Sequence, residues 1–246
     1  MTPSEILQAL AERDPFIRAN GHRWTPVDGV LSDRAGVIQM DQGTLVGTGD
    51  IPELARLLAD AEFSGIPHAL MPLGTLEYAG GLVAEKFGLV GAGAWTWLYM
   101  RELPPETSGE EYVGPLDDRL DEVAEALSEA NPETHAARNL PEHHWWGYVR
   151  GGKILGVCAV DDYGVEPGSD AARRHGVNLS GLGTRPDARG QGVGSAMMAA
   201  ITRHFVQRYG IVHYGVWNDN AVAFRIYRRL GYTSGPQIQS FTPQQA

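Results

Sequence analysis

The strongest chemical signal in the sequence is a glycine-rich turn between a predicted strand and a predicted helix. Gly190, Gly192 and Gly194 follow a strand that ends at Thr184 and stand at the start of a helix expected over about residues 192–208. Glycine permits positive φ and close approach of a ligand, and a helix N-terminus presents unpaired amides and a positive dipole end. The turn therefore suits a diphosphate, although it matches neither the Walker loop nor the dinucleotide fingerprint. On its own it could also be purely structural.

A second motif lies one predicted helix and one predicted strand later, in residues 218–232. Asn220, Ala223 and Tyr227 stand at i, i+3 and i+7, so they share one face of a helix, whereas Val222, Ile226 and Leu230 are expected on another. Together the two segments resemble the GNAT superfamily of N-acetyltransferases. Arg189-x-x-Gly192-x-Gly194 is similar to its pyrophosphate loop, and the segment from Asn220 through Tyr227 to Gly231-Tyr232 is similar to its Asn-Ala-Tyr-Gly-aromatic motif.

The resemblance implies acetyl-CoA, or another acyl-CoA, as cofactor and assigns residues to its parts. Backbone groups of one strand segment would pair with the pantetheine arm: Leu182, Gly183 and Thr184. Amides of the turn would hold the pyrophosphate: Arg189, Gly190, Gln191, Gly192, Val193, Gly194 and Ser195. The shared helix face completes the predicted cofactor site: Asn220, Ala223 and Tyr227.

Tyr227 is the predicted catalytic acid. The family gives this position the role of donating a proton to the departing thiolate. A phenol near pKa 10 is protonated at neutral pH, so it can serve as an acid. The alternative is a half-buried tyrosine whose hydroxyl has an ordinary structural partner.

The base that accepts the proton of the amine is less well defined. An alkylamine is almost wholly protonated at pH 7, so a base or a water chain must deprotonate it. Glu166 is the candidate carried forward, because with His175 it flanks the polar insertion ahead of the predicted cofactor strand. The other candidates stay open: Asp161, Asp162, His143, His144 and His175. Cys158 could in principle carry the acyl group, but a buried structural cysteine is expected there.

Composition limits the other possibilities. The 246 residues are 43% apolar and carry 30 acidic against 20 basic side chains, a formal charge of −10. This charge disfavours nucleic acid and anionic membranes as partners and favours cationic ligands. One cysteine leaves no disulfide framework, no metal cluster is evident, and neither a signal peptide nor a membrane span is expected. A cytoplasmic protein is predicted, and a homodimer stays open.

The expected elements give an α/β (α+β layered) architecture, and the resemblance implies that it is a GNAT-like mixed central sheet flanked by helices. Residues 105–246 are predicted to be the catalytic domain and residues 1–104 a degenerate GNAT-like domain. The predicted second domain opens with a strongly acidic helix, residues 116–130, which by the resemblance could attract a cationic amine, the alternative being a solvated face.

The first domain repeats the element order of the second: a hairpin that ends near Thr48, a helix from Asp50, then a strand, a helix and a strand that ends near residue 100. It lacks a glycine-rich loop, and Asp50 would fill or repel a phosphate site at the start of its helix. We therefore predict that this domain binds no cofactor and walls the acceptor cleft of the catalytic half.

The leading hypothesis is an N-acetyltransferase that moves an acetyl group directly from acetyl-CoA to a primary amine of a small cationic molecule or a peptide. The alternative is a non-catalytic acyl-CoA sensor. A purely structural or interaction protein, which would not bind coenzyme A, is disfavoured by the two coupled motifs.

Overall fold

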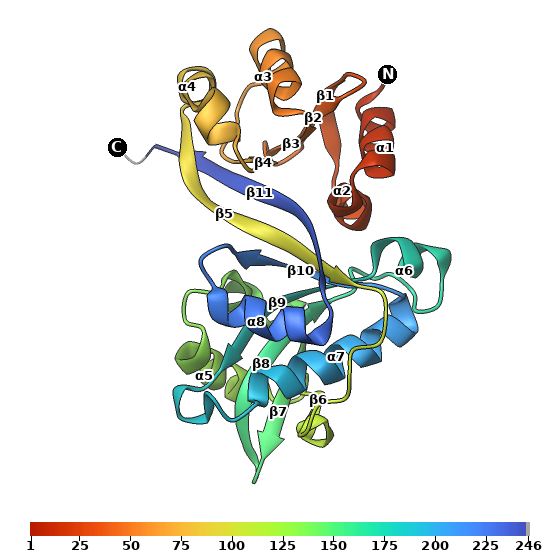
Figure 1. Cartoon of the computed structure of the whole chain (residues 1–246), viewed down its shortest axis with the longest axis vertical. Helices are drawn as coiled ribbons and strands as arrows, with labels where there is room; N and C mark the ends of the chain where they lie inside the picture. Colours follow the sequence, from red (N-terminus) through yellow and green to blue (C-terminus); the bar gives the residue numbers. More distant parts are fainter. Residues whose placement is uncertain (245–246) are drawn as a thin grey trace. The chain divides into compact units, whose positions relative to one another are not determined.

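The computed structural model describes residues 1–244, whose chain forms two compact units. Unit 1 contains Met1–Trp97, Val216–Asp219 and the described chain from Ser234 onward. Unit 2 contains Leu98–Gly215 and Asn220–Thr233. Figure 1 colours the elements along the chain. The predicted domain boundary near residue 104 stays a prediction, and residues 234–244, which it assigns to the second domain, lie in unit 1.

Unit 1 places six strands in the order β1-β2-β3-β4-β11-β5. Its helices are α1 (Pro3–Arg13), α2 (Pro15–Asn20), α3 (Ile51–Asp60) and α4 (Thr75–Phe87), with the short 3₁₀ helix η1 (Gly21–Arg23) after α2. Its strands are β1 (Pro26–Leu31), β2 (Ala35–Met40), β3 (Leu45–Gly49), β4 (Ala69–Pro72), β5 (Leu89–Met100) and β11 (Thr233–Pro243).

The helices of unit 1 begin at residues that can cap them. Thr2 and Glu5 form a capping box at the start of α1, and Asp50 accepts from the Glu53 amide at the start of α3. Helix α2 was not predicted, although Asp14 caps it and a proline follows directly. The hairpin of β2 and β3, the helix α3 and the strand β4 are confirmed.

Helices cover both faces of this sheet. On one face α3 and α4 pack over a buried cluster that includes Leu54, Leu58 and Val83 from the helices and Val37 and Met71 from the strands. On the other face a Cβ at Gly36 would lie 2.6 Å from a Leu10 methyl group of α1, so this close packing requires a glycine. The predicted layered α/β fold is therefore present in unit 1.

Unit 2 places its strands in the order β10-β9-β8-β7-β6. Its helices are α5 (Leu120–Ala130), α6 (Asp170–His175), α7 (Val193–Tyr209) and α8 (Ala221–Leu230), and its 3₁₀ helices are η2 (Glu110–Tyr112), η3 (His135–Glu142) and η4 (Pro186–Ala188). Its strands are β6 (Val113–Pro115), β7 (His144–Arg150), β8 (Lys153–Asp161), β9 (Val177–Thr184) and β10 (Val212–Trp217).

The acidic helix of unit 2 begins later than predicted. α5 starts at Leu120, because the backbone amide of Leu116 donates to the Trp145 carbonyl (2.7 Å) and the Asp117 carboxylate accepts from the Trp145 amide (2.7 Å). These bonds tie residues 116–117 to β7. Two short elements of unit 2, the strand β6 and the helix α6, were not predicted.

Helices α5 and α7 cover opposite faces of the unit 2 sheet (Figure 1). Val157 of β8 belongs to the buried cluster under α5, together with Val123 and Leu127. The preceding residue, Gly156, is oriented toward the opposite face of the sheet, where a Cβ would lie 2.6 Å from the Met197 sulfur of α7. This alternation is that of a strand buried on both faces.

Strand β9 changes neighbours part-way along its length. It pairs with β10 in parallel over Val177↔Val212 and Asn178↔His213, and the ladder ends there. Its register with β8 shifts between Val157 and Ala159, and Gly181 adopts φ +61° inside the strand. Such a bulge adds a residue, bends the strand and needs a residue tolerant of positive φ. The C-terminal half of β9 is thereby released from β10.

The two units share an element order. In unit 1, the strand series β1-β2-β3 is followed by α3, β4, α4 and β5. The strand series β7-β8-β9 of unit 2 is followed in the same way by α7, β10, α8 and β11, and the residues of β11 from Ser234 onward lie in unit 1. The parallel pairing of β3 with β4 is also two residues long, Leu45↔Ala69 and Val46↔Leu70. The predicted internal similarity is thus visible in topology. In the second series the last strand, β11, pairs with β4 in antiparallel fashion.

Across residues 1–244, the structure contains no helix that combines the length and the apolar character needed to cross a bilayer.

Truncation of the unit 1 core should reduce stability. Leu58 is fully buried in the cluster under α3, so Leu58→Ala should lower the free energy of unfolding by about 2–5 kcal/mol. The measurement is urea denaturation followed by circular dichroism. Val27→Ala is the control, because Val27 is 51% exposed and its truncation should change stability by no more than about 0.5 kcal/mol. Equal effects of the two variants would contradict this packing.

Candidate active site

A cavity of about 870 Å³ lies in unit 2 among the end of β9, the start of α7 and α8. Its size is within the range of ligand sites in proteins, about 300–1,000 Å³. Twelve of the thirteen residues predicted to bind cofactor line it: Leu182, Gly183, Thr184, Arg189, Gly190, Gly192, Val193, Gly194, Ser195, Asn220, Ala223 and Tyr227. The thirteenth, Gln191, is not among the lining residues, and its side chain donates to the Asp187 carbonyl (2.9 Å).

The N-terminus of α7 is open toward a ligand. Gly192 is its N-cap with φ +86°, and no side chain caps the helix. Gly190 also has positive φ (+75°), and a Cβ at either glycine would meet nothing within 4 Å. The backbone conformation, and not crowding, therefore requires these glycines. The amides of Val193 and Gly194 precede the first backbone hydrogen bonds of the helix, which the amides of Ser195 and Ala196 donate to the Gly192 carbonyl (3.0 Å each). Together with the helix dipole, the Val193 and Gly194 amides favour an anion.

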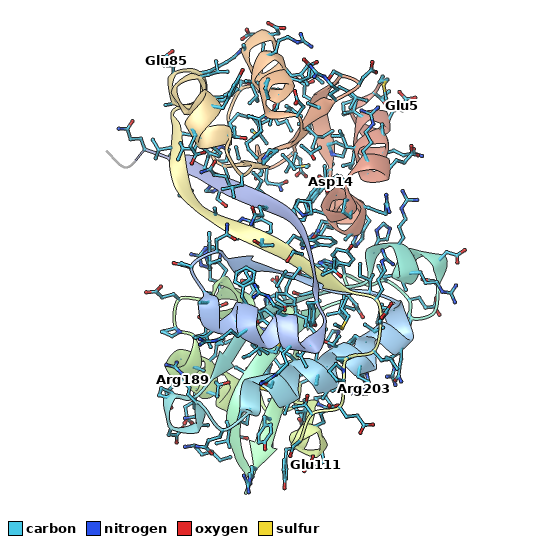
Figure 2. All side chains as sticks on the ribbon, in the orientation of Figure 1. Glu5, Asp14, Glu85, Glu111, Arg189 and Arg203 are labelled. Atoms are coloured by element: carbon cyan, nitrogen blue, oxygen red, sulfur yellow. The ribbon has the colours of Figure 1, made fainter. Side chains whose placement is uncertain are left out.

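Arginines surround this helix end, and Figure 2 labels one of them, Arg189. Its guanidinium donates to the Thr184 carbonyl (3.1 Å) and to the Ala130 carbonyl (3.3 Å), so it ties the loop to β9 and α5. Arg225 and Arg229 of α8 line the same cavity and were missed by the sequence analysis. Their spacing of four residues on the helix, beside an anion-binding loop, was the available signal.

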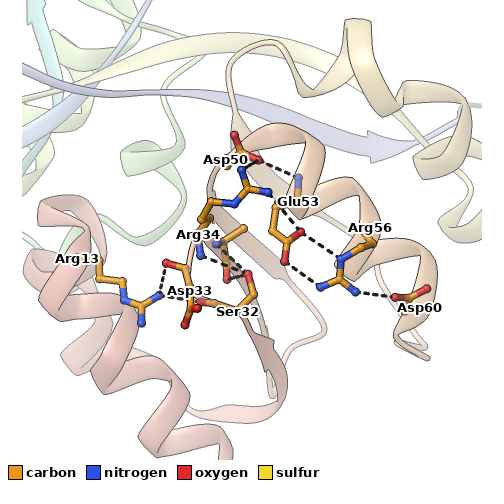
Figure 3. A network of polar contacts seen from close by, with 9 residues as sticks. Arg13, Ser32, Asp33, Arg34, Asp50, Glu53, Arg56 and Asp60 are labelled. Carbon is orange, nitrogen blue, oxygen red and sulfur yellow. Dashed lines mark hydrogen bonds and ion pairs between the residues drawn. The ribbon is translucent and has the colours of Figure 1, made fainter.

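The equivalent helix of unit 1 has the opposite electrostatic character. Asp50 occupies the N-cap of α3, and Glu53 lies in its first turn (Figure 3). Hydrogen bonds from Arg56 lower the pKa of Glu53 to about 2, so it is ionised at neutral pH. Arg34 lies 3.8 Å from Asp50 and 3.9 Å from Glu53. A phosphate at the start of α3 would face the carboxylates of Asp50 and Glu53, and the Glu53 amide already donates to the Asp50 side chain.

Tyr227 is more buried than predicted. Only 5% of it is exposed, and its ring packs edge-on against Tyr214, with centroids 4.6 Å apart, and against Tyr232, with centroids 5.7 Å apart. Tyr232 in turn contacts the Thr202 hydroxyl of α7. Burial raises the pKa of Tyr227 above its ordinary value, so the phenol stays protonated throughout the neutral range. Tyr227 therefore lines the cavity as a protonated phenol whose ring is held in an aromatic cluster.

The face of α8 toward the cavity is also broader than predicted. Val222 and Ile226, expected on a different face from Tyr227, line the cavity as well, and Val222 is 60% exposed. Asn220 caps the helix, with its side-chain oxygen accepting from the Ala223 amide (3.0 Å). Its amide nitrogen is the group that a ligand could use.

Comparison with known proteins identifies the family. A model of the acetyltransferase (GNAT) family matches residues 98–232. The chain belongs to the GNAT acetyltransferase family. A search of curated proteins finds no significant match.

Several solved structures have a fold similar to that of this chain over most of its length, at low sequence identity. A GCN5-related N-acetyltransferase from Kribbella flavida is 17% identical, with 97% of this chain and 95% of that chain covered and a TM-score of 0.55. A GNAT-family protein from Novosphingobium aromaticivorans is 14% identical, with coverages of 89% and 92% and a TM-score of 0.53. A GNAT acetyltransferase from Colwellia psychrerythraea is 16% identical, with coverages of 88% and 84% and a TM-score of 0.51.

The candidate bases of this GNAT chain are not among the residues that line the cavity. Glu166, the base carried forward, lies in the exposed loop between β8 and α6, so its predicted role gains no support from geometry. The others have partners elsewhere. His143 lies 2.6 Å from Asp161, Asp162 accepts from the Tyr209 hydroxyl (2.8 Å), His144 lies 3.4 Å from Asp117, and the His175 carbonyl contacts His213 (3.1 Å).

The acidic helix α5 uses several of its carboxylates within the protein. Arg185, which follows β9 and is 5% exposed, donates to Glu129 (2.6 Å) and to Glu125 (2.9 Å). Glu122 pairs with Arg119 (2.6 Å). The two Arg185 pairs connect α5 to the end of β9, and all three pairs reduce the negative charge of the helix that is available to attract an amine.

Gly183 shows how closely α5 approaches this strand. A Cβ at Gly183 would lie 2.8 Å from that of Ala130, and the Asn131 side chain donates to the Leu182 carbonyl (3.2 Å). One lone pair of that carbonyl is thereby used. The strand edge that would pair with a pantetheine arm is therefore fixed in place before any ligand binds.

A negative charge placed at the start of α7 should weaken anion binding. Gly192→Glu brings a carboxylate to the open helix end and should weaken the binding of coenzyme A by about tenfold or more. Isothermal titration calorimetry measures this effect. Gly192→Ala is the matched control, because it carries the strain of positive φ without the charge and should lose less affinity. Equal affinities for Gly192→Glu and the wild type would contradict an anion site here.

Cys158 should be inert in the folded protein. It is fully buried, and burial raises the pKa of its thiol to about 12, so at pH 8 only about one thiol in 10⁴ is ionised. A disulfide reagent at pH 8 should react slowly with the native chain and rapidly in denaturant. Fast reaction of the native protein would reopen a covalent acyl-cysteine route.

Proposed function

We propose that the chain is an acetyl-CoA-dependent N-acetyltransferase that transfers an acetyl group directly to a primary amine of a small cationic molecule or a peptide. One observation carries the proposal. A single cavity is lined by the uncapped start of α7, by the end of β9 that has no pairing with β10, and by Tyr227. The expected parts of an acyl-CoA site are thus adjacent.

The residues at each end of the cavity would have separate tasks. The amides at the start of α7 would bind the pyrophosphate, with charge support from Arg225 and Arg229. The edge of β9 would align the pantetheine arm. Acetyl-CoA, when bound, supplies a thioester whose carbonyl carbon the amine nitrogen attacks.

Tyr227 would act on the leaving group. As the C–N bond forms and the C–S bond breaks, negative charge develops on sulfur. A protonated phenol that lines the cavity can donate a hydrogen bond, and then its proton, to that sulfur. The aromatic cluster around Tyr227 limits the rotation of its ring and so orients the hydroxyl.

The amine must lose its proton without a carboxylate or histidine among the lining residues of the cavity. Water reached from the cavity would carry that proton away. The net charge of −10 favours the approach of a cationic acceptor, which is the argument for an amine of that type.

Removal of the Tyr227 hydroxyl should separate catalysis from binding. Tyr227→Phe should lower kcat roughly 10²- to 10⁴-fold, the usual contribution of a general acid. Its affinity for acetyl-CoA should stay within about threefold of the wild type, because the phosphates bind elsewhere. A thiol-release assay with a panel of primary amines, combined with calorimetry, measures both quantities.

Tyr214→Phe is the matched control, since it deletes a hydroxyl from the same cluster at a residue that does not line the cavity. It should retain most of the rate. Equal rates for Tyr227→Phe and the wild type would contradict the role of Tyr227.

The absence of a charged base from the lining residues favours one second candidate, an acyl-CoA sensor without turnover. A wild-type chain that binds acetyl-CoA but releases no thiol with any amine would support the sensor. Turnover with one amine excludes it.

A further inference from the structure

A second cavity, of about 400 Å³, lies within unit 1 and has no part in the acetyl-transfer site described above. Its lining comes from α2, β3, β4 and β11. Most of these side chains are apolar, and they include Phe16, Ile17, Val46, Leu70, Leu73 and Ile238. This volume is enough for a small organic molecule.

The position of the cavity matches a general rule for ligand sites. It lies beside the C-terminal residues of the parallel strands β3 and β4, whose pairing ends at Val46↔Leu70. Ligands in open α/β sheets bind beyond the carboxyl ends of parallel strands, where neighbouring strands diverge. The cavity therefore follows from the topology and is not an accident of surface shape.

One wall of this apolar cavity carries a buried carboxylate. Asp14 is 8% exposed and lies at the start of α2 (Figure 2). One oxygen accepts from the amides of Phe16 (2.8 Å) and Ile17 (3.2 Å), and the other accepts from the Thr48 hydroxyl (2.5 Å). These three donors are uncharged. They hold the carboxylate in a fixed orientation without neutralising it.

The surroundings exclude an anionic ligand. A phosphate or carboxylate in this cavity would face Asp14, and the nearby start of α3 is already capped by Asp50. A cation with an apolar body satisfies both features, because its ammonium can pair with Asp14 in a weakly polar setting while its body displaces water from the apolar walls.

We propose that this unit 1 cavity is a binding site for a small apolar amine, whose ammonium group pairs with Asp14. The amine binds with its nitrogen at the Asp14 and Thr48 wall and its hydrocarbon part against Val46, Leu70 and Ile238. The site is independent of acyl-CoA, and it requires no chemical step.

The test uses the full-length chain and two matched probes, phenethylamine and the uncharged 2-phenylethanol. Amide chemical shifts are followed in NMR titrations. Phenethylamine should shift residues 46–49 and 236–238 and should bind about tenfold or more tightly than the alcohol. Saturating acetyl-CoA should leave this binding unchanged. Shifts confined to residues 182–195, or equal affinities for the two probes, would overturn the proposal.

Two variants separate the charge from the shape of the cavity. Asp14→Asn keeps one oxygen that can accept from the Phe16 and Ile17 amides, and its amide nitrogen can donate to the Thr48 hydroxyl oxygen where the carboxylate accepted. The variant removes the charge, so it should lose the preference for the amine while its affinity for the alcohol is retained. Leu73→Trp fills the cavity from a partly exposed position and should block both probes.

The melting temperature of each variant shows whether it is folded. If Asp14→Asn does not fold, Leu73→Trp and the comparison of the two probes in the wild type still decide the question. A folded Asp14→Asn chain that keeps its preference for the amine, or amine binding that persists in Leu73→Trp, would overturn the proposal.

Discussion

The early separation of β9 from β10 is the constraint on which the candidate site depends. The two strands share only the pairs Val177↔Val212 and Asn178↔His213. The bulge at Gly181 then turns the second half of β9 away from β10. At Leu182–Thr184 the edge of β9 that would face β10 is therefore not paired with it, while the other edge stays paired with β8. Without this separation the cavity beside α7 would be filled by sheet hydrogen bonds.

Packing from the opposite face keeps the released strand in place. Arg185 is bonded to two carboxylates of α5, Arg189 is bonded to the carbonyls of Thr184 and Ala130, and Gly183 allows α5 to approach closely. A strand edge that is free yet fixed can bind an extended ligand at little entropic cost. The same contacts explain why much of the acidic face of α5 is structural.

The two units show how one topology can form clefts of different charge. Each has two parallel strands that diverge after two residue pairs, with a helix between them. In unit 2 that helix begins at Gly192 with open amides, and arginines line the cavity. In unit 1 it begins at Asp50 with a side-chain cap, and the adjoining cavity holds Asp14. Local capping and charge, more than the fold, therefore decide what each cleft can bind.

The sequence was sufficient for those parts of the site that local patterns encode. The glycine motif around Gly190, Gly192 and Gly194 and the spacing of Asn220, Ala223 and Tyr227, through their resemblance to the GNAT family, predicted twelve of the residues that line the cavity. These features depend on contacts within one turn and one helix. Most helices and strands were predicted for the same reason, because caps and periodicity are local.

The parts that were missed depend on pairings between distant segments. The bulge at Gly181 is defined only by the register of β9 with β8, and β11 joins the strands of unit 1 through its pairing with β4. The burial of Tyr227 arises from Tyr214 and Tyr232 on other elements. The role of Glu166 stays a prediction from its place in the sequence, and the residue lies in an exposed loop. By contrast, α2 had a readable signal in Asp14-Pro15.

A crystal structure of the full-length chain with acetyl-CoA tests the central claim most directly. The account predicts one molecule per chain, with its pyrophosphate on the amides at the start of α7 and its thioester sulfur within hydrogen-bond distance of the Tyr227 hydroxyl. Acetyl-CoA bound in unit 1, or bound in unit 2 with its thioester remote from Tyr227, would contradict the account.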